Sequence, residues 1–146
     1  MNFIKLNENW NAEPNAPRPS IKISGVNIKL SFYLNCFCYE QFNEGDMGIL
    51  NFVNCLKYRM GTPNDEGFFI YGQSRYKQYG VEWGHFYLVE DSDWHSNFPD
   101  GIIIDDSIPA DKLNHYLFYF KDETFEAIAE SCSFRIIKAV KQINYC

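Results

Sequence analysis

The chain has 146 residues, with 13 lysines and arginines against 19 aspartates and glutamates, which gives a formal net charge of -6. An aromatic content of 18% excludes a disordered chain, and a chain of this length buries one hydrophobic core, so we expect a single domain over residues 1–146. The negative charge argues against nucleic acid and anionic membranes as partners, because both need a cationic surface, and it favours a basic protein partner.

The chain shows no sign of secretion or membrane insertion. Its first residues, MNFIKLNENWN, are polar and contain no apolar stretch of the kind that a secretory leader needs. The apolar runs, such as residues 102–104, span only a few positions, whereas about 20 are needed to cross a bilayer. Five cysteines at irregular spacing are typical of reduced thiols rather than of a disulfide framework. We therefore expect a cytoplasmic protein.

The first predicted elements are an extended segment and a β-hairpin. Residues 1–20 are predicted to be a proline-rich, extended lead-in, because AEPNAPRPS carries three of the six prolines, which fix φ and remove N–H donors. The next segment, VNIKLSFYLN at 26–35, alternates apolar and polar residues throughout, as a half-buried strand does. Two isoleucines precede it across the turn at Ser24 and Gly25, which predicts a hairpin.

Two later segments fit a strand and a helix alike. Residues 49–60, ILNFVNCLKYRM, have apolar residues at alternate positions but also along one side of a helix. We prefer a strand there, because the turn-rich stretch GTPNDEG closes the segment. Residues 124–132, TFEAIAESC, show the same ambiguity, since Phe125, Ala127 and Ala129 alternate with polar residues while Phe125, Ala129 and Cys132 also satisfy helical spacing.

The remaining pattern indicates further strands. The stretch VEWGHFYLVE at 81–90 is largely apolar on both parities, as expected of a strand covered on two sides. DGIIIDDS predicts a short buried strand, and HYLFYFKDETFEAIAES predicts two strands joined at residues 121–123. In the tail SFRIIKAVKQINY, the apolar residues from Ile136 to Ile143 have helical spacing, which favours a terminal helix over a last strand.

These elements together predict the fold class. About seven short antiparallel strands with turns between them are typical of a mainly β protein. We expect a single-domain antiparallel β-sandwich or a strongly bent sheet, with a C-terminal helix as an optional addition.

The sequence lacks the motifs of common catalytic and metal sites. It contains no HExxH, no pair of CxxC units, no GxSxG elbow and no glycine-rich phosphate loop. Asp91, Ser92, Asp93 and His95 resemble a series of metal ligands, but the series lacks the glycine and the terminal glutamate of a calcium loop. We therefore expect no catalysis, no metal and no cofactor.

The histidines and cysteines are best interpreted as structural. Histidines on predicted strands, such as His85, are more often partly buried and hydrogen-bonded than catalytic. If the strand at 26–35 continued, Cys36 and Cys38 would lie on its core face as small buried residues. One alternative is a small enzyme with a site built around His85 and His95. Another is a self-associating structural or assembly module.

Acidic residues gather at three predicted turns, near Trp94, Phe98 and Tyr119 in the sequence. If these turns meet at one edge, they form an acidic surface with aromatic anchors, which suits a basic partner. The alternative is a set of ordinary solubilising turns that face water. The candidate partner-binding residues are Glu90, Asp91, Asp93, Trp94, Asp105, Asp106, Asp122 and Glu123.

Three stretches of the chain carry a resemblance. NEGDMGILNFVNCLKYRMGTPNDEGFF, VEWGHFYLV and HYLFYFKDETFEAIAES resemble small, acidic, single-domain bacterial proteins of uncharacterised type, some of which look like immunity proteins of polymorphic toxin systems. The resemblance covers about two-thirds of the chain and rests on fold-type patterns, so no functional residue is carried over. It implies a protein that binds and blocks a cognate toxin domain, without catalysis and without a cofactor.

Overall fold

The computed structural model describes residues 1–61, 63–64, 67–68, 76–99 and 101–139. The described strands form one antiparallel sheet in the order β1-β5-β7-β8-β4-β3-β2, and β6 pairs with β4 beside this path. The strands are β1 (Asn2–Lys5), β2 (Ser20–Ser24), β3 (Asn27–Tyr33), β4 (Met47–Gly61), β5 (Phe86–Glu90), β6 (Ile102–Ile103), β7 (Asn114–Tyr119) and β8 (Thr124–Ile137). The short helices are η1 (Lys77–Tyr79), α2 (Trp94–Asn97) and η2 (Ala110–Lys112).

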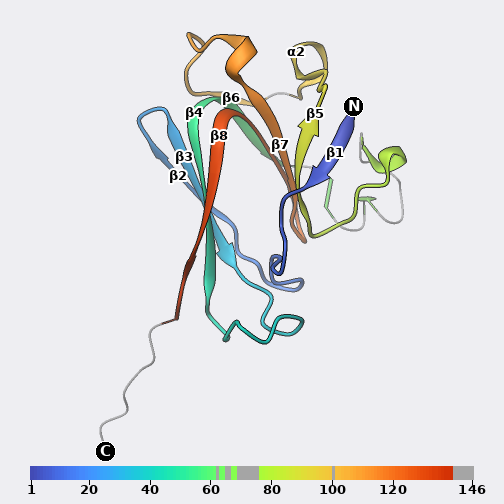
Figure 1. The fold of residues 1–146 in the computed structure, drawn as a ribbon, viewed down its shortest axis with the longest axis vertical. Coiled ribbons are helices and arrows are strands. Elements are labelled where there is room, and N and C mark those ends of the chain that lie inside the picture. Colours follow the sequence, from blue (N-terminus) through green and yellow to red (C-terminus); the bar gives the residue numbers. More distant parts are fainter. Residues whose placement is uncertain (62, 65–66, 69–75, 100, 140–146) are drawn as a thin grey trace, which may run out of the picture.

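Two long strands, β4 and β8, give the sheet its strong bend (Figure 1). They pair with each other from end to end, with a shift of register between Cys55 and Lys57. Asn54, just before this shift, has a φ of 50°, and such an irregularity lets a strand bend and twist. β3 pairs with β4 only as far as Phe52, before the bend, while β7 pairs with the first part of β8. The sheet therefore has two halves, one around β3 and one around β7.

The main core lies between these two halves. Phe32 of β3 and Phe118 of β7 have ring centroids 5.1 Å apart, although β4 and β8 separate their strands in the sheet. Phe118 also stacks on Phe120 and contacts Phe86, at 4.2 and 5.4 Å. Burial of these rings explains the high aromatic content of the chain, because large apolar rings contribute much of the area removed from water.

A second, smaller core covers the opposite face of β5 and β7. Side chains alternate along a strand, so Leu117 and Tyr119 point away from the main core that holds Phe118. Phe68 and Tyr76, from the connection between β4 and β5, pack against them. The prediction that this part of the sheet is covered on two sides is therefore confirmed.

The predicted fold class is also confirmed. The protein is mainly β, with a strongly bent antiparallel sheet, and β2 and β3 form the predicted hairpin, in which Ile21 faces Leu30. Residues 49–60 and 124–132, which fit a strand and a helix alike, both lie in strands, β4 and β8. The reason is mutual, because each of these segments supplies the other with a pairing partner along its length.

The structure differs from the prediction at the end of the chain. Ile136 and Ile137 lie in β8 rather than in a helix, because Met47 and Gly48 of β4 extend far enough to pair with them. The part of the favoured helix beyond residue 139 lies outside the described residues. β1 was not predicted. It has only four residues and pairs only with β5 at an edge of the sheet, so its own sequence carries too short a pattern to indicate a strand.

A buried carboxylate holds the chain where β8 ends. Asp46 accepts hydrogen bonds from the backbone N–H groups of Ala139 and Asn43, at 2.8 and 2.9 Å, and from the Lys138 ammonium at 2.9 Å. Burial alone would raise the pKa of Asp46, but these donors outweigh it and hold the pKa below the ordinary value of 3.8. The ionised carboxylate therefore anchors the end of β8 to the loop before β4.

Candidate functional site

Two of the three predicted acidic turns lie at the same end of the molecule, with α2 and β6 (Figure 1). The first turn joins β5 to α2, and the second follows β6. The third turn lies beyond the other end of β7, because β7 begins beside the last residues of β5 and runs away from them. The six residues of β7 span about 20 Å at roughly 3.3 Å per residue, so the third turn is remote from the other two. The first two turns hold Glu90, Asp91, Asp93, Asp105 and Asp106, and the third holds Asp122 and Glu123.

Lys57 of β4 joins α2 to β6. Its backbone pairs with Ile103 of β6, and its ammonium lies 5.4 Å from the centre of the Trp94 ring and 4.6 Å from that of Phe98. A cation over aromatic rings is an attractive contact, so this lysine holds α2 and β6 together. We call the residues from Glu90 to Phe98 and from Ile102 to Asp106 the acidic end.

Two of the three aromatic residues predicted as anchors, Trp94 and Tyr119, are buried, whereas Phe98 is half-buried. Trp94 is only 8% exposed and stacks on the His95 ring at 3.8 Å, while Tyr119 lies in the second core. The exposed apolar residues are instead Ile102 and Ile103, at 54% and 65%. The prediction of a buried strand at this position was wrong in this respect, because β6 pairs only with two residues of β4 and nothing described covers its isoleucines.

A chain of hydrogen bonds connects the acidic end to the sheet. Ser92 Oγ lies 2.5 Å from His115 Nδ1, and His115 Nε2 lies 2.9 Å from Glu126 Oε1. Arg59 donates to the other oxygen of Glu126 at 2.9 Å, and the Tyr76 hydroxyl lies 3.4 Å from Oε1. This pattern is satisfied when Nε2 of the imidazole carries the proton and Nδ1 accepts from the Ser92 hydroxyl.

The order serine, histidine and carboxylate is that of an activated nucleophile. The two imidazole nitrogens are exchanged relative to serine proteases, in which Nε2 faces the serine. The side chains of His115 and Glu126 are 0% and 1% exposed. Of the three residues Ser92, His115 and Glu126, only the half-buried Ser92 could therefore meet a substrate. Ser92 also stabilises the turn between β5 and α2, because its Oγ accepts a hydrogen bond from the N–H of Trp94 at 3.2 Å.

The two histidines of the alternative enzyme site do not lie together. His85 precedes β5 and its Nδ1 is 2.8 Å from the side-chain nitrogen of Asn7, whereas His95 lies in α2, beyond the other end of β5. Burial, and then the charge of Lys5, lower the pKa of His85 below 6.5, although Glu82 acts in the opposite direction. This histidine is therefore neutral at physiological pH.

The cysteines with perturbed acidity are poor nucleophiles. Burial raises the pKa of both Cys55 and Cys132 to about 12, and the thiol, unlike the thiolate, is a weak nucleophile. Cys38 is exposed rather than in the core, because β3 ends at Tyr33. Within the described ranges, no three His, Cys, Asp or Glu side chains are grouped to hold a metal ion, and no helix is long and apolar enough to span a membrane.

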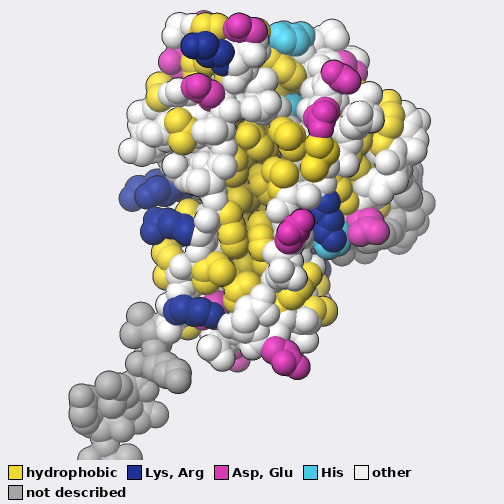
Figure 2. Space-filling model, in the orientation of Figure 1, with side chains coloured by type: hydrophobic (Ala, Val, Ile, Leu, Met, Phe, Trp, Pro, Cys, Tyr) yellow, Lys and Arg dark blue, Asp and Glu magenta, His cyan; other side chains and the backbone are white. Residues whose placement is uncertain are grey.

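An apolar groove of about 420 Å³ opens between the two halves of the sheet. Figure 2 shows a strip of hydrophobic side chains over the middle of this face, with acidic side chains beside it. Three parts of the chain form its walls, namely the segment after β1, the strands β5 and β7, and the strands β4 and β8. Sequence reasoning missed this groove, because its walls meet only when the sheet bends.

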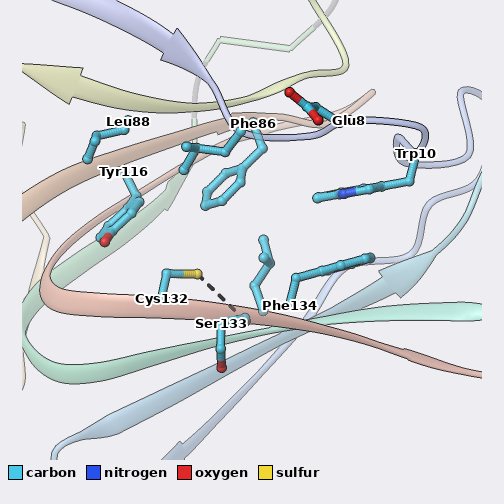
Figure 3. Close-up of a pocket in the computed structure, with 10 residues that line it drawn as sticks. Glu8, Trp10, Phe86, Leu88, Tyr116, Cys132, Ser133 and Phe134 are labelled. Carbon is cyan, nitrogen blue, oxygen red and sulfur yellow. Dashed lines mark hydrogen bonds between the residues drawn. The ribbon is translucent and has the colours of Figure 1, made fainter.

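Aromatic rings dominate the groove (Figure 3). Trp10 stacks on Phe134 with centroids 4.1 Å apart and planes at 5°, and Phe86 stacks on Tyr116 at 5.9 Å and 14°. Glu8 lies at the edge of the groove and is exposed. Burial, and then the nearby Cys132, raise the pKa of Tyr116 to about 12, so its hydroxyl stays neutral at physiological pH.

Comparisons with known proteins add no relative. No protein-family model, no curated protein and no solved structure matches the chain.

Proposed function

We propose that the protein is a non-catalytic binding protein of the immunity or inhibitor kind, which acts in the cytoplasm and neutralises a basic toxin domain by direct binding through the acidic end. The observation that carries the proposal is the exposed isoleucine pair of β6, which precedes Asp105 and Asp106 by a single residue and pairs with the strand whose Lys57 contacts α2.

This arrangement matches the anatomy of a protein interface. Interfaces combine an apolar centre, which loses water on binding, with a polar rim that remains accessible. Ile102 and Ile103 supply exposed apolar area, and the exposed carboxylates of Glu90, Asp91 and Asp106 supply a negative rim. A negative rim accelerates encounter with a basic partner and disfavours acidic competitors. The net charge of -6 acts in the same direction over a longer range.

The toxin part of the proposal rests on the resemblance of three stretches to small acidic bacterial proteins, some of which look like immunity proteins. A toxin that acts on nucleic acid needs a cationic substrate surface, and an acidic inhibitor can occupy that surface in place of phosphates. The exposed isoleucines and carboxylates of the acidic end support this end as the surface that such a partner would contact.

Neutralising two carboxylates of the acidic end should slow partner binding. The variant D91N/D106N removes charge from both turns, and asparagine tolerates the positive φ of 51° at Asp91. Tagged protein is first used to capture the partner from a lysate of the source organism, at low and at moderate salt. We expect association of the purified partner at low salt to slow by about tenfold, with a smaller effect at moderate salt.

The matched control is D122N/E123Q, which changes the net charge equally but lies at the remote third turn. Equal slowing by both variants would assign the effect to overall charge and reject the acidic end as the binding surface. A variant I102S/I103S should mainly accelerate dissociation, because the isoleucines act only after encounter. Unchanged dissociation in that variant would remove the isoleucine pair from the interface.

The hydrogen-bonded chain of Ser92, His115 and Glu126 supports a second candidate function, an acyl-transfer enzyme. Ser92 Oγ would attack a carbonyl carbon while its proton passes to His115 Nδ1 and then to the leaving group. Water would then hydrolyse the acyl-serine and restore the free hydroxyl. Glu126 would stabilise the imidazolium that forms in between, since its Oε1 lies 2.9 Å from Nε2.

A fluorophosphonate probe tests this second candidate. Attack of Ser92 Oγ on phosphorus would expel fluoride and leave a stable phosphonyl-serine, which intact-mass and peptide spectrometry detect. If the enzyme function holds, we expect labelling of Ser92 that is lost in S92A and kept in S96A, which alters an exposed serine of α2. Absence of labelling in the folded wild-type protein would mean that the hydrogen bonds among Ser92, His115 and Glu126 are purely structural.

A further inference from the structure

We propose that the aromatic groove between the two halves of the sheet is a binding site for a small protonated amine with a flat, apolar body. This site shares no lining residue with the acidic end, so it stands whether or not the protein binds a toxin.

The size and lining of the groove fit a small molecule. Small-molecule sites usually enclose about 300–1,000 Å³ and are mostly apolar with a few polar groups, and this groove has about 420 Å³. Its rings come from four different elements, with Trp10 after β1, Phe86 on β5, Tyr116 on β7 and Phe134 on β8. Trp10 and Phe134 stack on each other in the wall of the groove, and of the two it is the half-buried Phe134 that offers apolar surface to another ring.

The charge of the groove selects the ligand class. Among the described residues that line the groove, Glu8 is the one Asp, Glu, Lys or Arg, and burial keeps Tyr116 and Cys132 protonated at neutral pH by raising the pKa of each to about 12. A negative carboxylate at the mouth of an aromatic groove attracts a cation and repels an anion. The electron-rich faces of the aromatic rings that line the groove favour the same sign.

The polar groups inside the groove agree with a neutral apolar body. The Cys132 thiol is a weak donor that lies 3.8 Å from the carbonyl oxygen of Ser133, as Figure 3 shows. Tyr116 lines the groove with its ring, and its hydroxyl has the side chain of Asn114 as a hydrogen-bond partner. The groove therefore combines one charged group at the edge with an apolar interior.

Matched probes test the proposal. Tryptamine and indole-3-propionate share an indole ring but carry opposite charges, and their binding to the full chain is measured by calorimetry and by amide chemical shifts. We expect tryptamine to bind with a dissociation constant of about 1 mM or lower and about tenfold more tightly than the propionate. The shifts should centre on β5, β7 and the segment after β1.

Variants separate the site from general charge attraction. E8Q should reduce the preference for tryptamine to about threefold or less, while E40Q, which neutralises an exposed glutamate outside the groove, should keep it. C132F fills the groove and should weaken both probes, with folding checked by circular dichroism. Equal affinity for both probes, no binding of tryptamine at millimolar concentration, or an unchanged preference in E8Q would each overturn the proposal.

Discussion

Replacing Glu126 by glutamine is expected to lower the free energy of unfolding by about 3–5 kcal/mol. The side chain of Glu126 is 1% exposed, and its two oxygens lie 2.9 Å from Arg59 Nη1 and from His115 Nε2. Glutamine keeps the size of the side chain but removes its negative charge. Arg59, whose side chain is 11% exposed, then loses its ionic contact with this residue while its own charge stays largely out of water.

Urea denaturation followed by circular dichroism at neutral pH measures this loss. The control is E40Q, which makes the same chemical change at an exposed position and should alter stability by no more than about 0.5 kcal/mol. A loss in E126Q as small as that of the control would contradict this expectation, because it would mean that the charge of Arg59 does not need the carboxylate of Glu126.

Glu126 also shows where sequence reasoning stops. In the alternating pattern of residues 124–132 it has the parity of Thr124 and Glu130, which is the parity of a water-facing side. In the structure that face is covered, because residues of the connection between β4 and β5, such as Phe68 and Tyr76, pack against it. Nothing within the strand itself indicates that a remote segment folds back over it.

The hairpin of β2 and β3 was predictable from local pattern, whereas the groove and the grouping of the acidic turns were not. The sequence of β3 alone indicates a half-buried strand, and its alternate apolar residues Ile28, Leu30 and Phe32 do lie in the main core. The groove depends on the bend of β4 and β8, which follows from their long pairing and the irregularity near Asn54. The three acidic turns were grouped by composition alone, but the length of β7 places one of them far from the others.

The isoleucines of β6 show the opposite error, in which residues expected to be buried are exposed. Three consecutive isoleucines between acidic residues are typical of a buried strand, yet Ile102 and Ile103 are exposed. Close docking explains why β6 stays in place, because a Cβ at Gly101 would lie 2.6 Å from the carbonyl oxygen of Tyr58. The backbone therefore fits tightly against β4 while the two side chains stay exposed.

Truncating Phe118 to alanine is expected to lower the free energy of unfolding by about 3–5 kcal/mol, because a buried ring is replaced by a cavity. Phe118 is 0% exposed and contacts rings from both halves of the sheet, including Phe32 at 5.1 Å and Phe86 at 5.4 Å. It also lies 6.0 Å from Trp10, so the cavity would open behind a wall of the aromatic groove.

Two comparison variants decide what the loss in F118A means. F37A removes the same ring from a position that is 75% exposed, and it should change stability by no more than about 0.5 kcal/mol. F118L keeps most of the volume and should cost less than half as much as F118A, since it removes ring contacts but leaves a smaller void. If F118L were as destabilising as F118A, the ring contacts themselves, rather than the filled volume, would hold the two halves of the bent sheet together.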